Sequence, residues 1–156
     1  MRADALIARY RLKPHPEGGW YARLYRSPSQ VSVTRGSRAA VTTIVYLLRA
    51  GELSRWHRVR SNEIWHFYAG ASLELLRADP ALTAVETVII SPPDREAPVA
   101  VVAADHWQAA RSCGDYSLLG CTVAPGFEFA DFTLLADEPV LAAALRARHP
   151  HYAAWL

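Results

Sequence analysis

The sequence of 156 residues has few cysteines, a single lysine and no long apolar run, and each shortage excludes a class of protein. Two cysteines, Cys113 and Cys121, are too few for a disulfide framework or a cysteine-based zinc site. We therefore expect reduced thiols in a cytoplasmic protein. No stretch approaches the ~20 apolar residues of a membrane helix, and the N-terminus lacks the apolar segment of a signal peptide. The sequence thus predicts neither membrane insertion nor export.

The charge pattern does not indicate a nucleic-acid-binding protein. The net charge is only +2, and the arginines are scattered among acidic residues along the whole chain. Proteins that bind nucleic acids usually gather their positive charge in one patch. Hydrophobic residues make up 51% of the chain, which is enough for a sizeable core at this length. We expect a single domain, residues 1–156.

Most of the chain divides into short apolar segments separated by glycine, proline and aspartate. Their length and their content of β-branched and aromatic residues predict strands rather than helices. Only residues 3–12 and Pro139–Arg148 have the pattern of short helices. The pattern alone is compatible with a jelly roll, a barrel or an immunoglobulin-like sandwich. The expected strands outside the central segment 51–70 are residues 20–27, 39–48, 72–78, 83–90, 97–103, 107–110, 115–124 and 129–135.

The central segment, GELSRWHRVRSNEIWHFYAG, contains the most informative pair of polar residues. It predicts two strands joined by a turn at residues 60–62. Because strand side chains alternate between two faces, Glu63, Trp65 and Phe67 share one face. His57 precedes the turn and combines a side chain that titrates near neutral pH with the nearby carboxyl of Glu63.

This segment resembles the first sequence motif of the cupin superfamily. Gly51, His57, Glu63 and Gly70 occupy their expected positions, but Val59 replaces the second histidine of the motif. Together with residues 15–27, 106–110 and 118–132, it makes the chain similar to the cupin-5 family, whose members are mostly of unknown function. The resemblance implies an all-β fold, a double-stranded β-helix jelly roll with short N- and C-terminal helices and a barrel core at about residues 19–135.

The resemblance also implies where a metal ion would be held. In metal-binding cupins the ligand positions correspond here to His57, Val59, Glu63 and Gln108. Valine supplies no donor atom and glutamine only a neutral oxygen, so this set suits zinc or iron poorly. We expect no cofactor and well under one equivalent of metal per chain. The alternative is a weakly bound divalent ion on His57, Glu63 and Gln108.

The candidate site residues follow from the same segments. We expect His57 to act as a general base oriented by Glu63. In cupin epimerases a tyrosine acts as the acid, so the resemblance implies Tyr25, or alternatively Tyr46, in that role. The expected ligand-binding residues are Trp65, Phe67, Gln108, Tyr46 and Arg55. A purely structural role for the His57–Glu63 pair remains the alternative. His15, His149 and His151 lie in loops next to prolines, and we expect none of them to be functional.

The sequence therefore predicts a cupin that binds a small molecule in its barrel. We expect an isomerase, epimerase or lyase that uses acid–base chemistry; the alternatives are a non-catalytic ligand-binding cupin and a metal-dependent dioxygenase. No nucleic acid or membrane is an expected partner. Apolar residues expected on outward faces, namely Thr42, Ile44, Ile64 and Tyr68, predict a homodimer.

Overall fold

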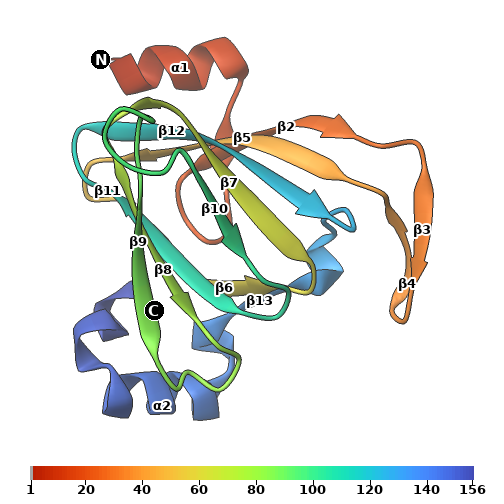
Figure 1. Cartoon of the computed structure of the whole chain (residues 1–156), viewed down its shortest axis with the longest axis vertical. Coiled ribbons are helices and arrows are strands. Elements are labelled where there is room, and N and C mark those ends of the chain that lie inside the picture. Colours follow the sequence, from red (N-terminus) through yellow and green to blue (C-terminus); the bar gives the residue numbers. More distant parts are fainter. Residues whose placement is uncertain (1) are drawn as a thin grey trace.

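The computed structural model describes residues 2–156, which form two antiparallel β-sheets packed face to face (Figure 1). The six-stranded sheet contains, in spatial order, β1 (Lys13–Pro14), β2 (Trp20–Arg26), β5 (Thr42–Arg49), β12 (Tyr116–Ala124), β7 (Asn62–Gly70) and β10 (Val99–Val102). The five-stranded sheet contains β13 (Phe132–Leu134), β6 (Leu53–Val59), β11 (Trp107–Ser112), β8 (Leu73–Ala78) and β9 (Val85–Ile90). This is the predicted jelly roll, and the prediction is confirmed.

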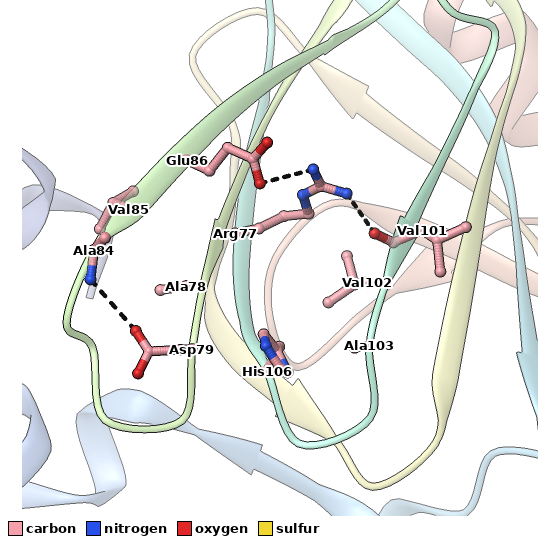
Figure 2. A pocket seen from close by; sticks show the side chains of 10 residues that line it. All are labelled: Arg77, Ala78, Asp79, Ala84, Val85, Glu86, Val101, Val102, Ala103 and His106. Carbon is pink, nitrogen blue, oxygen red and sulfur yellow. Dashed lines mark hydrogen bonds and ion pairs between the residues drawn. The ribbon is translucent and has the colours of Figure 1, made fainter.

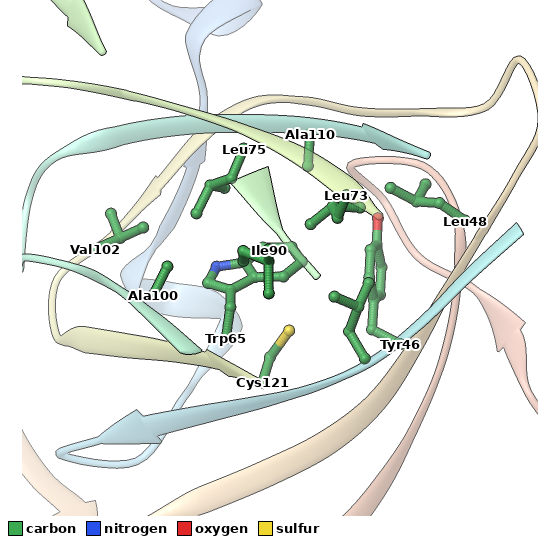
Figure 3. Close-up of a cluster of buried hydrophobic side chains, with 11 residues drawn as sticks. Tyr46, Leu48, Trp65, Leu73, Leu75, Ile90, Ala100, Val102, Ala110 and Cys121 are labelled. Atoms are coloured by element: carbon green, nitrogen blue, oxygen red, sulfur yellow. The ribbon is translucent and has the colours of Figure 1, made fainter. Parts of the chain in front are cut away.

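The main hydrophobic core fills the space between the two sheets (Figure 3). Tyr46 and Trp65 enter it from the six-stranded sheet, and their rings meet edge to face at 5.7 Å. Leu73, Leu75 and Ala110 come from the five-stranded sheet and are fully buried. Burying each large side chain contributes about 1.5–3 kcal/mol, so this cluster holds the sheets together beside the polar cavity described below.

Helix α1 (Arg2–Tyr10) covers part of the outer face of the six-stranded sheet. Its Leu6 and Ile7 pack against Val45 and Leu47 of β5. The helix was predicted at residues 3–12, and it ends two residues earlier because Arg11 adopts a left-handed conformation with φ 52°.

The C-terminal segment covers the outer face of the five-stranded sheet. Helix α2 (Pro139–Arg148) has the predicted bounds and is followed by a 3-10 helix, η3 (Pro150–Trp155). Leu145 and Trp155 of this segment pack with Trp56 of β6 and Trp107 of β11. Among residues 2–156, no helix is long and apolar enough to span a membrane.

A hairpin that the sequence did not predict projects from the body of the molecule (Figure 1). It consists of β3 (Gln30–Val33) and β4 (Gly36–Ala39). Its Arg38 binds the buried carboxylate of Asp131 through two hydrogen bonds of 2.8 and 2.9 Å. Asp131 lies in a 3-10 turn, η1 (Phe129–Asp131), so the predicted strand at residues 129–135 is reduced to β13. A second 3-10 turn, η2 (Leu135–Asp137), leads into α2.

One expectation about the outward faces is wrong. Thr42 and Ile44 were placed on an outer face, but both face the interior cavity, as does Tyr46 on the same side of β5. The alternation along β5 sends Thr43 and Val45 outward instead.

The homodimer stays a prediction, and the part of the six-stranded sheet that α1 leaves uncovered is the expected interface. Tyr68, Val99 and Val101 expose 52%, 44% and 48% of their surface there, and Val101 pairs with Ile64 in the sheet. We expect light scattering to give a dimer mass, and Val101→Glu to give a monomer. Val140→Glu, at an 81% exposed valine of α2, is the matched control and should leave the mass unchanged. A monomeric wild-type protein at micromolar concentration would contradict the prediction.

Candidate functional site

The loop between β1 and β2, residues 15–19 with the sequence HPEGG, folds inward between the two sheets. Gly18 has φ 111°, and a Cβ atom there would collide with the carbonyl oxygen of Leu53. Only glycine fits this close approach of two backbone segments. The glycine therefore allows the preceding side chain, Glu17, to reach the interior.

Hydrogen bonds from both sheets anchor this loop. The hydroxyl of Tyr46 donates to the carbonyl oxygen of Gly18 at 2.6 Å. Arg55 of β6 donates from its backbone N–H to the carbonyl oxygen of Glu17 at 2.8 Å and from its guanidinium to that of Pro16 at 2.6 Å. These hydrogen bonds hold the loop in one position.

The carboxyl group of Glu17 lies at the centre of a buried polar cluster. The hydroxyl of Ser54 donates to Oε1 at 2.9 Å. Oε2 lies 3.2 Å from Nε2 of His57 and 3.3 Å from Nδ1 of His15. The side chains of Glu17 and His57 are only 8% and 2% exposed, so water does not screen this contact.

The hydrogen bonds of His57 determine how its ring is protonated. Nδ1 lies 2.7 Å from the carbonyl oxygen of Arg55, which can only accept, so Nδ1 carries a hydrogen. In a neutral ring, Nε2 is then an acceptor, and it faces the Glu17 carboxyl oxygen. Two acceptors do not attract each other at this distance. A proton on Oε2 of Glu17 or on Nε2 of His57 would make this contact favourable.

A second carboxyl, that of Glu63, is oriented by a buried chain of hydrogen bonds. The indole N–H of Trp65 donates to Oε1 of Gln108 at 2.9 Å, and Nε2 of Gln108 donates to Oε2 of Glu63 at 2.5 Å. Gln108 comes from β11 and both other residues from β7, so the chain connects the two sheets. It fixes the direction of the Glu63 carboxyl.

These groups surround a small interior cavity with a volume of about 40 Å³. Phe132 stacks on the ring of His57 at 5.5 Å beside it. The cavity is lined by His15, Glu17, Tyr21, Thr42, Ile44, Tyr46, His57, Val59, Glu63, Cys121, Val123 and Phe127. It combines two carboxyl and two imidazole groups with apolar walls, as small-molecule sites typically do.

Burial shifts the pKa values of the two carboxyl and two imidazole groups of this cluster towards the neutral forms. It raises the pKa of Glu17, and it raises the pKa of Glu63 to about 7 although the charge of His57 opposes the change. It lowers the pKa of His57 and that of His15, because a charged imidazole also loses its hydration. The pKa values of the carboxyl groups are thus raised while those of the imidazoles are lowered, which favours transfer of a proton between the two kinds of group.

The structure brings some of the predicted site residues to the cavity. His57, Glu63 and Tyr46 line it, and Gln108 contacts it through Glu63. Trp65 belongs to the hydrophobic core and Phe67 packs against that core, while Arg55 anchors the backbone of the inward loop.

Tyr25, the predicted acid, does not reach the cavity. Its side chain is 51% exposed. Simple alternation from Tyr21 and Arg23 would point Tyr25 inward, but a β-bulge between Arg23 and Tyr25 pairs it with Thr43 on the outward face. Tyr21 and Tyr46 are the tyrosines of the cavity.

Sequence reasoning missed Glu17 and assigned no function to His15. Both lie in a loop, where the alternation of a strand gives no information about direction. The available signal was the segment HPEGGW itself, in which two consecutive glycines follow a charged residue. Such a pair is typical of a tight turn that approaches another backbone closely.

The comparisons with known proteins agree with this architecture. Residues 4–135 match the family Cupin_5, described as "Cupin superfamily (DUF985)". This chain belongs to that family. No curated protein matches the sequence.

Two solved structures resemble this cupin along nearly its whole length. A protein from Shewanella oneidensis is 34% identical to this chain, with a TM-score of 0.83. The match covers 97% of this chain and 92% of that protein. A hypothetical protein from Leishmania major is 28% identical, with a TM-score of 0.84 and coverages of 97% and 94%. Oxalate decarboxylase from Bacillus subtilis is 11% identical, with a TM-score of 0.58. The match covers 86% of this chain and 33% of that protein, so it shows a shared fold alone.

The donor atoms of this cupin do not fit a resident metal ion. Val59 supplies none, and the side-chain amide of Gln108 is occupied by Trp65 and Glu63. Within residues 2–156, no group of three or more His, Cys, Asp or Glu side chains is arranged to hold a metal. The low metal content stays a prediction.

A larger depression of about 450 Å³ lies between β8, β9 and β10, with His106 at its base (Figure 2). Its polar groups are satisfied within the protein. Arg77 donates to Glu86 and to the carbonyl oxygen of Val101, and Asp79 accepts from the backbone N–H of Ala84.

The raised pKa of Glu63 predicts a pH-dependent stability that Glu63→Gln removes. Between its ordinary pKa of 4.5 in the unfolded chain and about 7 in the folded one, the folded state binds more protons. The free energy of unfolding therefore falls as pH rises through this window. Glutamine has no titratable proton at this position. Relative to wild type, the free energy of unfolding of Glu63→Gln should therefore rise by on the order of 2–3 kcal/mol between pH 5 and pH 8.

Denaturant unfolding at several pH values measures this difference. Glu96→Gln, at an exposed carboxyl, is the control and should leave the pH profile unchanged. A pH profile of Glu63→Gln that runs parallel to wild type would show that the Glu63 carboxyl is ionised in the cavity.

Proposed function

We propose that this cupin is an enzyme that transfers protons to and from a small molecule in its interior cavity, as an isomerase, epimerase or lyase. The observation that carries the proposal is the buried contact between His57 Nε2 and Glu17 Oε2 at 3.2 Å, which a proton shared between the two atoms would make favourable. A structural ion pair would need no adjoining cavity, whereas this pair lines one.

The shared proton gives the pair two uses. With the proton present, the pair can donate it to a ligand oxygen as a general acid. After releasing it, the pair can accept a proton from a ligand carbon, and the charged imidazole that results is stabilised by the Glu17 carboxylate. The hydrogen bond from Nδ1 to Arg55 keeps the ring in the required orientation throughout.

Glu63 supplies a second proton carrier in the same cavity. Its pKa of about 7 means that both its protonated and its ionised forms are present at neutral pH. A 1,1- or 1,2-proton transfer needs two proton carriers in different environments. One removes the proton from the ligand, and the other returns it. Gln108 fixes the carboxyl without neutralising it.

The surroundings of the cavity suit this chemistry. Its walls are apolar and aromatic, and the titratable side chains are almost completely buried. A site that excludes water strengthens each proton-transfer interaction. The same walls also suit a non-catalytic binding protein, so the test must measure proton transfer and not binding alone.

Solvent-deuterium exchange measures proton transfer directly. We expect the protein in D₂O to catalyse exchange at the acidic carbon of at least one enolisable compound among pyruvate, dihydroxyacetone and glyceraldehyde, followed by proton NMR. His57→Ala should reduce the exchange rate about 100-fold or more, and Glu17→Gln should reduce it strongly as well. Both variants should remain folded by circular dichroism.

Glu86→Gln, a carboxyl outside the cavity, is the control and should exchange at the wild-type rate. Exchange at the uncatalysed rate with all three compounds, or exchange that survives His57→Ala, would contradict the proposal. Saturable binding without any exchange would favour the non-catalytic cupin.

A further inference from the structure

The interior cavity adjoins a wider depression at the surface. The depression has a volume of about 310 Å³ and shares Tyr21, Thr42, Ile44 and Phe127 with the cavity. We call it the vestibule; its other lining residues are Lys13, Arg23, Glu128 and Phe129. The four shared lining residues place the two spaces next to each other.

Because the two spaces differ in size, they can hold different parts of one ligand. A water molecule needs roughly 10–15 Å³ of such volume, so the cavity of about 40 Å³ has room for only a few heavy atoms. The body of a small organic molecule must then occupy the vestibule. Only its reacting end can lie among His57, Glu17 and Glu63.

The charges of the two spaces are opposite in sign. The vestibule has Lys13 and Arg23, and its one carboxylate, Glu128, is bound by Arg26 at 2.8 Å. Among residues 2–156, the side chain of Arg23 has no hydrogen-bond or ion-pair partner, and the ammonium group of Lys13 lies over the ring of Tyr21 at 5.3 Å without an acidic partner. The cavity, in contrast, contains the two carboxyl groups of Glu17 and Glu63 and no arginine or lysine.

A second anion would be unfavourable inside the cavity. It would lose its hydration and face two carboxyl groups. A neutral hydroxyl or carbonyl group, in contrast, can donate to or accept from them. The apolar walls of the vestibule, Tyr21, Ile44, Phe127 and Phe129, favour an apolar body between the two ends.

We infer that the substrate is an elongated small anion: a carboxylate or phosphate ester whose charged group lies at Lys13 and Arg23 and whose neutral oxygen-bearing end enters the cavity. This inference rests on the proposed function for the identity of the reacting end. The binding geometry itself does not depend on turnover.

Probes of matched shape test this orientation. We choose 4-(hydroxymethyl)benzoate, with one neutral and one anionic end, and 4-(hydroxymethyl)phenyl phosphate as the phosphate counterpart. The corresponding amide, 4-(hydroxymethyl)benzamide, removes the charge, and terephthalate has a charge at both ends. Titrations followed by NMR of the ¹⁵N-labelled protein give each Kd without requiring a reaction.

We expect 4-(hydroxymethyl)benzoate and 4-(hydroxymethyl)phenyl phosphate, which are charged at one end only, to bind more tightly than the amide and than terephthalate. Whichever of carboxylate and phosphate binds more tightly identifies the charged group. Arg23→Gln and Lys13→Gln should each weaken anion binding about fivefold, the effect of losing one partly exposed ion pair, and leave the Kd of the amide unchanged. Added salt should weaken anion binding in the wild type and less so in the variants.

Arg95→Gln, at an exposed arginine of another loop, is the matched control and should bind like wild type. Equal affinity for amide and anion, unchanged affinity in Arg23→Gln and Lys13→Gln, or no binding of either anion at millimolar concentration would overturn the inference. Anion binding that depends on Arg23 in a protein without deuterium exchange would retain the orientation and reject the enzyme. Deuterium exchange in a protein whose anion binding does not depend on Arg23 would support the enzyme and reject the proposed orientation.

Discussion

The site depends on one interaction, the contact of the Glu17 carboxyl with His57 in the interior of the barrel. Glu17 reaches this position because Gly18 passes so close to the backbone of β6 that no other residue fits. Burial then favours the neutral forms of both partners, in which Glu17 carries a proton that faces the acceptor Nε2 of His57. The same backbone constraint therefore sets the geometry and the protonation of the site.

The two sheets contribute different parts of this arrangement. The five-stranded sheet provides His57 and Ser54, which hold Glu17 directly, and Gln108, which orients Glu63. The six-stranded sheet provides Glu63 itself and most of the apolar walls. Each carboxyl is thus fixed from the opposite sheet. A shift of one sheet relative to the other would disturb both proton carriers together, which makes the packing of the core part of the function.

Much of the fold follows from the sequence, because short strands and their turns leave a periodic pattern. The alternation along residues 62–70 correctly places Glu63 and Trp65 on the inner face of β7. Alternation fails where the backbone departs from a regular strand. The bulge after Arg23 turns Tyr25 outward, and the inward loop, which has no strand period, places Glu17 beside His57. Tertiary contacts decide both cases, and a local pattern does not contain them.

The protonation state of the Glu17–His57 contact is the most direct test of this account. Long-range ¹⁵N–¹H correlation NMR at neutral pH, with His57 assigned through His57→Gln, reports the hydrogen on each ring nitrogen. The account predicts a protonated Nδ1, and an Nε2 shift intermediate between a free and a protonated nitrogen that changes in Glu17→Gln. A ring with hydrogen on Nε2 only, unaffected by Glu17→Gln, would contradict it.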